Sequence, residues 1–199
     1  TFDAIIGAKG QVLFESGNVT AHSLMDIVND TGDSVYYLVK DVPEKVRDAG
    51  LRTVKAFDVR SRFVHLEFFI LNEDQEGLGK KGDILGLEVN MRPAGGYTPE
   101  MYNYAYETDG NKTWADMICF DVSPKPEGDH HYCAFYGRRD GKNFVMSHDE
   151  IMEKYGHCMK MWGRIPDALS GAMANQMYVC NFDTEEEMMA YYADLKACW

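Results

Sequence analysis

The sequence predicts an α+β fold in which helices flank an antiparallel β-sheet. The first observation is that strand-like segments follow one another across short turns, which is typical of hairpins. The second is that segments with helical apolar spacing stand between hairpins and not after every strand, as a parallel sheet would need. The first predicted hairpin covers Ala4–Phe14, and Lys9-Gly10 supplies its turn.

Two elements follow this hairpin. Apolar residues at helical spacing, namely Leu24, Ile27 and Val28, predict a helix over Ala21–Asn29. The run Ser34–Lys40 is rich in β-branched and aromatic residues and therefore predicts a strand.

A longer helix is predicted over Pro43–Phe57. Asp41 is expected to cap it, and Pro43 suits the first turn because a proline lacks only an amide that has no helical partner there. Gly50 weakens the middle of this helix, since glycine loses more conformational freedom than other residues. The residues expected to face inward are Val46, Ala49, Val54 and Phe57.

A long hairpin is predicted from two strongly apolar strands, Arg62–Leu71 and Asp83–Asn90. The charged, glycine-rich segment Asn72–Gly82 connects them. The next segment, Met91–Gly96, contains one proline and two glycines, which predicts a loop with unusual backbone geometry.

Two further helices are predicted over Pro99–Glu107 and Thr113–Phe120. The segment Asp121–Asp129 that follows is rich in proline and glycine, which is typical of a linker. We therefore predict two domains, 1–124 and 125–199.

Beyond this boundary the sequence predicts a small α+β subdomain. Its predicted strands are Tyr132–Arg138, Asn143–Met146, His157–Arg164 and Met177–Phe182. The first two of these strands are expected to pair as a hairpin. Ser147 and Glu150 have the spacing of a capping box and begin a helix. A last, acidic helix is expected to start at Asp183 or Thr184 and to end near Cys198.

Composition and charge exclude several classes of protein. The 199 residues include 20 Lys and Arg against 32 Asp and Glu, a net charge of 20 − 32 = −12. This acidity argues against binding to duplex nucleic acid or to a membrane of anionic lipid, since both favour a basic face. The hydrophobic content of 45% excludes a disordered chain. No apolar run approaches the roughly 18 residues that span a bilayer.

Sulfur-containing residues point to a reducing compartment. The five cysteines are odd in number and contain no Cys-x-x-Cys pair, so neither a disulfide framework nor a zinc site is indicated. No signal peptide is recognisable, and a cytoplasmic location is expected. Methionines are enriched in the last third of the chain. Core filling is the simple account of them, and a partner-binding surface is the alternative.

Two carboxylates and an amide are predicted to converge on the long hairpin. Side chains alternate along a strand, so His65 and Glu67 share one face of the first strand. Glu88 and Asn90 share one face of the second strand for the same reason. Carboxylates inside apolar strands are costly without a partner, and a magnesium or manganese ion suits Glu67, Glu88 and Asn90. The alternative is that the glutamates point to solvent from a one-sided sheet.

The residues after the hairpin are typical of an anion-binding site. Arg92 follows Asn90 by two residues, and its guanidinium offers a fork of donors to a phosphate or carboxylate. Gly95 and Gly96 let backbone amides approach an anion closely. The sequence therefore predicts that metal and phosphate are bound side by side.

These segments resemble the metal-binding end of ATP-grasp enzymes, which include biotin carboxylase, carbamoyl phosphate synthetase and D-alanine–D-alanine ligase. The resemblance is carried by Arg62–Phe68 and Gly86–Gly96; it is sharpest over 52–106 and loose over 130–199. It implies that the chain is the C-terminal half of an ATP-grasp fold joined to the small α+β subdomain.

The resemblance implies a role for each matching residue. In the family a carboxylate on one strand and a Glu-x-Asn on the next hold two magnesium ions on the β- and γ-phosphates of ATP. Glu67 matches the first carboxylate, Glu88 would bridge the two ions, and Asn90 would ligate the second. Arg92 matches an arginine that steadies the acyl-phosphate or tetrahedral intermediate. His65 falls where relatives often carry a basic residue.

The resemblance also implies a ligase activity with ATP as co-substrate. The intact enzyme would transfer the γ-phosphoryl group of ATP to a small-molecule carboxylate, and an amine or similar nucleophile would then displace phosphate. The family's phosphate-contacting lysines, glycine-rich lid and adenine hinge are expected in an N-terminal half outside this sequence, so the chain alone is expected to be inactive. The rival hypothesis is a non-catalytic, ATP-grasp-derived module for binding and assembly, and the sequence leaves a homo-oligomer open.

Overall fold

The computed structural model describes residues 1–20, 29, 32–122 and 128–199. These residues form two compact units that interleave along the chain. The first unit consists of 1–18, 41–99 and 108–127, and the second of 19–40, 100–107 and 128–199. The predicted helix over Ala21–Asn29 lies outside the described residues except for Asn29. The predicted domain boundary at residue 124 also lies outside them and remains a prediction.

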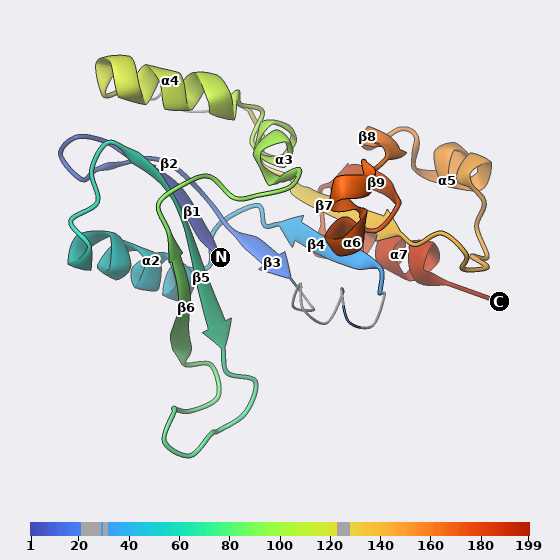
Figure 1. The fold of residues 1–199 in the computed structure, drawn as a ribbon, viewed down its shortest axis with the longest axis horizontal. Helices are drawn as coiled ribbons and strands as arrows, with labels where there is room; N and C mark the ends of the chain where they lie inside the picture. The colour runs from blue at the N-terminus through green and yellow to red at the C-terminus, as the bar shows by residue number, and fades with distance from the viewer. Residues whose placement is uncertain (21–28, 30–31, 123–127) are drawn as a thin grey trace. The chain divides into compact units, whose positions relative to one another are not determined.

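A four-stranded sheet with the order β2-β1-β5-β6 forms the centre of the first unit (Figure 1). Its strands are β1 (Phe2–Ile6), β2 (Val12–Ser16), β5 (Arg62–Ile70) and β6 (Ile84–Asn90). All three strand pairings are antiparallel, which confirms both predicted hairpins. Gly10 has a φ of 80° in the turn between β1 and β2, a conformation that glycine adopts without strain.

Helix α2 (Glu44–Ala56) covers one face of this sheet. Its Val46 and Val54 pack with apolar side chains of β1 and β5, as the helical spacing predicts. Gly50 lies against the buried ring of Phe2, and a Cβ atom at this glycine would come within 2.3 Å of the ring. Gly50 thus allows the helix and the sheet to approach closely.

Two details of α2 differ from the prediction. The N-cap is Pro43 and makes no side-chain capping hydrogen bond, so the prediction that Asp41 caps the helix is wrong. Phe57 was expected to face inward, but it is the C-cap residue and is 60% exposed. A cap residue lies partly outside the helix, so the helical spacing no longer determines the direction of its side chain.

The opposite face of the sheet is divided between an aromatic end and a polar end. At the aromatic end Phe63 contacts Phe14 and Trp114, with ring centroids 6.4 and 6.0 Å apart. Trp114 belongs to α4 (Gly110–Phe120), which ends at the C-cap residue Asp121. The carboxylate of Asp121 accepts hydrogen bonds from Ala8 and Gln11 in the turn between β1 and β2, which holds the end of α4 at the aromatic end of the sheet.

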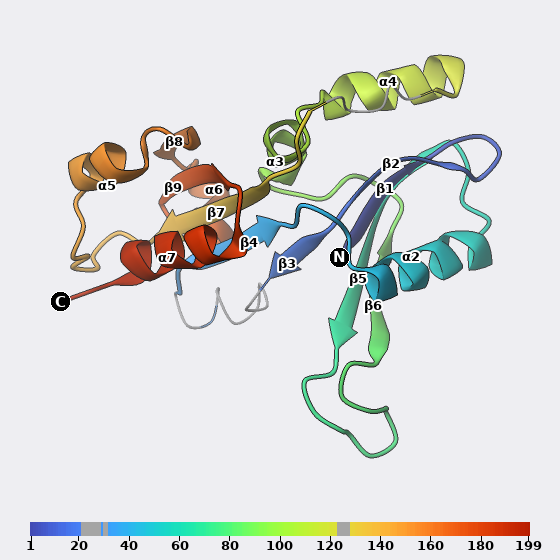
Figure 2. The ribbon, with the colours of Figure 1, turned by 180° about the vertical axis from the view of Figure 1, so that it is seen from behind.

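The second unit is built on a five-stranded sheet with the order β3-β4-β7-β9-β8 (Figure 2). Its strands are β3 (Asn18–Thr20), β4 (Ser34–Leu38), β7 (Tyr132–Arg138), β8 (Met159–Arg164) and β9 (Gln176–Phe182). The pairings β4–β7, β7–β9 and β8–β9 are antiparallel. The α+β fold class with antiparallel sheets is therefore confirmed.

Helices complete the second unit. They are α3 (Thr98–Ala105), which begins two residues before the unit, α5 (His148–Tyr155), α6 (Asp167–Met173) and α7 (Glu185–Lys196). Helices α5 and α7 both begin with a capping box, as predicted for Ser147 and Glu150. Their buried faces form one core with β7 and β9. Among the helices that the structure describes, none is long and apolar enough to cross a membrane.

One predicted strand is absent from the described part of the second unit. Residues Asn143–Met146 form no strand, and only Phe144 makes an isolated bridge, to Cys198. Strand β7 pairs instead with β4 and β9, so the predicted hairpin is wrong. Residues Asn143–Met146 cannot pair with β7, because both edges of β7 are already hydrogen-bonded to other strands.

The contact between Gly50 and Phe2 leads to a stability prediction. We expect Gly50→Ala to lower the free energy of unfolding by about 1–3 kcal/mol, because the added methyl overpacks a filled core. The measurement is urea unfolding followed by circular dichroism. Gly171→Ala in α6 is the matched control, since nothing lies within 4 Å of its added methyl. An equal gain in stability for both variants would contradict the prediction.

Candidate functional site

The pairing of β5 with β6 places the predicted site residues on one face of the first sheet. His65 lies opposite Asn90, and Glu67 lies opposite Glu88. Residues two apart on a strand share a face, so these four side chains stand on the face that α2 leaves uncovered. The register therefore brings Glu67, Glu88 and Asn90 next to one another, as the alternation of the two strands predicts.

A buried carboxylate on β1 joins this group, and the sequence analysis missed it. Asp3 pairs with His65 across β1 and β5, and it is completely buried. One Asp3 oxygen lies 2.5 Å from Nδ1 of His65, and the other accepts a hydrogen bond from the Thr1 hydroxyl. The available signal was an isolated acidic residue in the apolar strand Phe2–Ile6, which by itself does not identify its partner.

His65 connects the buried carboxylate to the predicted metal site. Its Nε2 atom lies 3.1 Å from a carboxylate oxygen of Glu67, so the imidazole contacts an acid on each side. Burial alone would lower the pKa of His65 below its ordinary 6.5, but the hydrogen bond and charge of Asp3 and the charge of Glu67 raise it above that value. A protonated His65 donates to both carboxylates and holds Glu67 in place.

Glu67 and Glu88 are suited to a shared cation. Like charges directly opposite each other destabilise a strand pair. Glu88 is exposed, and among the described residues no lysine or arginine forms an ion pair with either carboxylate. Asn90 adds an amide oxygen, and its Nδ2 atom is buried without a hydrogen-bond partner in the described part of the chain, so this donor suits an anion beside the cation. Carboxylate and amide oxygens are the ligands that a hard divalent cation takes, so the residues fit such an ion.

The protein supplies only part of a coordination shell here. Among the described residues, no group of three or more His, Cys, Asp or Glu side chains is placed to enclose a metal ion. Magnesium commonly takes one or two carboxylates and completes its shell with water and phosphate oxygens. Two glutamates and an amide therefore suit an ion that is bound together with a phosphate better than an ion enclosed by protein.

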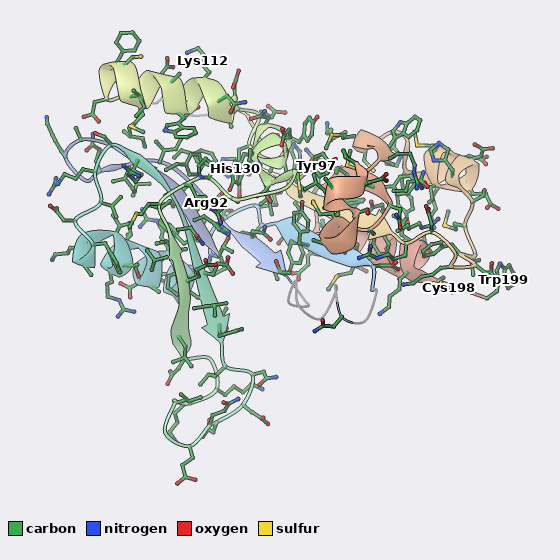
Figure 3. All side chains as sticks on the ribbon, viewed as in Figure 1. Arg92, Tyr97, Lys112, His130, Cys198 and Trp199 are labelled. Carbon is green, nitrogen blue, oxygen red and sulfur yellow. The ribbon has the colours of Figure 1, made fainter. Side chains whose placement is uncertain are left out.

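The predicted anion-binding residues lie just beyond β6. Arg92 is exposed, and its guanidinium donates to the carbonyl oxygen of Pro93 at 2.9 Å (Figure 3). Gly95 and Gly96 are both exposed. Gly96 has a φ of 63°, and a Cβ atom at Gly95 would meet nothing within 4 Å. The backbone of this loop is therefore open to a ligand.

Three solved structures share the fold of the chain. They are phosphoribosylglycinamide synthetase from Anaerococcus prevotii (12% identity, TM-score 0.61), the phosphoribosylaminoimidazole carboxylase ATPase subunit from Aquifex aeolicus (13%, 0.61) and an ADP complex of N5-carboxyaminoimidazole ribonucleotide synthetase (13%, 0.53). Each match covers 98% of this chain and 51%, 55% and 47% of the respective structures. No protein-family model and no curated protein sequence matches the chain.

The likeness to these structures confirms the resemblance in fold that the sequence predicts. The chain spans about half their length, which agrees with the expected C-terminal portion. At 12–13% identity this likeness establishes the fold alone. An activity has to be argued from the side chains described above.

The contact between Asp3 and His65 leads to a prediction about pKa and stability. We expect Asp3→Asn to lower the pKa of His65, because burial, the largest single influence, remains, while the charge of Asp3, which outweighs it only together with the hydrogen bond and Glu67, is lost. The measurement is a histidine NMR titration. The loss should also cost about 1–3 kcal/mol of unfolding free energy. In the wild type, this contribution is present below pH 6.5 and is lost as the pH rises through the higher folded-state pKa.

Asp48→Asn is the control for the change in net charge. Asp48 pairs with Arg52 on the exposed surface of α2 and lies outside the contacts of His65. An unchanged or higher pKa of His65 in Asp3→Asn would show that the buried carboxylate does not sustain the protonated imidazole.

Proposed function

We propose that this chain is the metal- and phosphate-binding portion of an ATP-grasp ligase that activates a carboxylate as an acyl-phosphate for attack by an amine or similar nucleophile. The observation that carries the proposal is the pair of opposed glutamates, Glu67 and Glu88, with Asn90 beside them on the uncovered face of the sheet. The fold shared with three ATP-grasp enzymes supports it.

Glu67, Glu88 and Asn90 are the residues that would hold the divalent cation, magnesium or manganese. When bound, such an ion offsets negative charge on a transferring phosphoryl group. Like charges directly opposite each other on paired strands are unfavourable, and an ion held by Glu67 and Glu88 would offset this.

Asp3 and His65 act as positioning residues in this proposal. The buried Asp3 fixes the ring of His65 through Nδ1, and Nε2 of the same ring engages one oxygen of Glu67. The second oxygen of Glu67 has no partner among the described residues and is left for a ligand. Such support of a metal-binding carboxylate restricts its rotamers and makes binding less costly in entropy.

Arg92 and the glycines that follow it supply the contacts to the anion. A guanidinium presents two parallel donors to a phosphate or carboxylate, and the exposed Arg92 can direct them at an acyl-phosphate or tetrahedral intermediate. The amides of Gly95 and Gly96 can approach the same anion because both glycines are exposed and carry no side chain.

The nucleotide would be shared with a segment outside this sequence. One of the similar structures holds ADP, and all three are about twice as long as this chain. We propose that the missing half of the same enzyme supplies the adenine pocket and the lysines that contact the phosphates. The basic residues that balance ATP would then lie on that half, since this chain carries a net charge of −12.

The rival function, a non-catalytic assembly module, depended on a surface rich in methionine. In the last third of the chain Met173, Met177 and Met188 are buried, Met152, Met159 and Met161 are half-buried, and Met189 is 52% exposed. These methionines form no continuous exposed surface among the described residues, and we favour the ligase.

The metal ligands can be tested on the chain itself. We expect it to bind Mn²⁺ weakly, and Glu88→Gln to weaken binding at least about tenfold because one of two charged ligands is lost. The measurement is Mn²⁺ titration by electron paramagnetic resonance. Glu73→Gln, an exposed residue in the connection between β5 and β6, is the matched control. Equal affinities of the two variants for Mn²⁺ would show that Glu88 is not a metal ligand.

The division of the nucleotide site can be tested by calorimetry. We expect isothermal titration to show little affinity of these 199 residues for ATP in the presence of magnesium, because half of the proposed ATP clamp is absent. Tight binding of ATP to the chain alone would overturn the proposal that it is one half of the site.

A further inference from the structure

A buried arginine lines an open pocket in the second unit. Arg138 ends β7, is only 6% exposed and lines a pocket of about 680 Å³. Its guanidinium donates from Nε and Nη2 to the carbonyl oxygen of Leu195, at 3.1 and 3.0 Å, and from Nη1 to that of Met146, at 2.7 Å. Its Cζ atom lies 4.1 Å from the ring centroid of Phe144. All of these partners are uncharged, and Arg138 forms no ion pair with any described residue.

The hydrogen bonds leave Arg138 with spare donors. A guanidinium has five N–H groups, and three of them are used, so two have no partner in the described part of the chain. Burial lowers the pKa of Arg138, as expected for a cation whose lost hydration is not fully replaced. A phosphate or carboxylate in the pocket would supply both the missing charge and the missing acceptors.

The composition of the pocket favours an anion. The other residues that line it are Lys142, Asn143, Phe144, Met146, Ser147 and Trp199. None of these is acidic, although Asp and Glu outnumber Lys and Arg by 32 to 20 in the chain. The carboxylates that contact the lining residues already have partners: Asp33 pairs with Lys142, and Glu150 accepts hydrogen bonds from Ser147.

The pocket also has an aromatic side, which backbone hydrogen bonds hold in place. The amide of Val145 donates to the carbonyl oxygen of Ala197 at 2.8 Å, and the amide of Trp199 donates to that of Asn143 at 2.9 Å. Trp199 is thereby fixed beside the segment that carries Phe144 (Figure 3). Its side chain is 89% exposed, so the indole ring is available for stacking on a ligand.

We propose that this pocket binds a small aromatic anion, a planar ring that carries a phosphate or a carboxylate group. The spare donors of Arg138 bind the anionic group, and the ring stacks on Trp199. The volume of the pocket lies in the range of small-molecule sites. The pocket lies wholly within the second unit, and the proposal does not depend on the proposed ligase function.

A purely structural role for Arg138 is the competing explanation. Its two hydrogen bonds to Leu195 reach a carbonyl oxygen in the last turn of α7, where positive charge is favourable. This role needs neither the exposed ring of Trp199 nor a pocket without acidic side chains. Variants of Trp199 therefore separate the two explanations, because only a ligand site uses that ring.

The test is an NMR titration of the ¹⁵N-labelled full chain with two probes, indole-3-acetate and phenyl phosphate. We expect at least one of them to bind with a dissociation constant of about 0.1–1 mM. Among the three tryptophans, the indole N–H signal of Trp199 should shift, whereas those of Trp114 and Trp162 should not. Whichever probe binds more tightly shows whether the pocket takes the carboxylate or the phosphate.

Two further compounds test the two parts of the ligand. Tryptophol lacks the anionic group, and inorganic phosphate lacks the ring, so each should bind at least about tenfold more weakly than the better probe. No shift of the Trp199 signal with either probe would overturn the proposal. An equal affinity for tryptophol or for inorganic phosphate would overturn it as well.

Two variants with matched controls assign the binding to its side chains, with affinity measured from the backbone amide signals of 142–147. Trp199→Ala should weaken binding about fivefold through the loss of stacking. Trp162→Ala, at another exposed tryptophan of the second unit, should leave it unchanged. Arg138→Gln should weaken it at least about tenfold. Arg164→Gln, at an exposed arginine of β8 that pairs with Asp140, is its control.

The outcome of the variants is decisive even if the buried site is sensitive to change. An unchanged affinity in Trp199→Ala, or in a folded Arg138→Gln, would overturn the proposal. If Arg138→Gln fails to fold, as judged by circular dichroism, the comparison of Trp199→Ala with Trp162→Ala decides the question, since both replace side chains on the surface.

Discussion

The buried carboxylate of Asp3 is the constraint on which the candidate site depends. A charged group with no exposure to solvent requires a hydrogen-bonding partner, and the structure provides His65 at 2.5 Å and the Thr1 hydroxyl. The imidazole is thereby fixed at one nitrogen, which aims the other at Glu67. The direction of the half-buried Glu67 side chain is thus determined from the neighbouring strand, by a carboxylate that is completely buried.

The two faces of the first sheet differ in composition, and this difference allows a polar site in a stable fold. On one face α2 and the strands bury a continuous apolar core, which supplies the favourable term in folding. On the other face an aromatic end under α4 gives way to the polar row of Asp3, His65, Glu67 and Glu88. The two like-charged glutamates are tolerated on this face because the apolar core on the other face stabilises the sheet.

Local pattern was sufficient to predict most elements and the face of the sheet on which Glu67, Glu88 and Asn90 stand. Alternation along β5 and β6 placed Glu67, Glu88 and Asn90 together, since their register follows from one hairpin. The partnership of Asp3 and His65 was not predictable, because it joins strands 62 residues apart and depends on β1 pairing with β5. The missing strand at Asn143–Met146 has the same origin: both edges of β7 are occupied by strands distant in sequence.

The interleaving of the two units has a consequence for how the molecule can be divided. Segments 19–40 and 100–107 of the second unit interrupt the first, so the chain passes repeatedly from one unit to the other. Neither unit is encoded by one continuous stretch of the gene, and a single proteolytic cut does not separate the two units. A truncation that preserves the second unit, which spans 19–199, must therefore preserve most of the first, whereas one that preserves the first unit, which spans 1–127, keeps only 19–40 and 100–107 of the second.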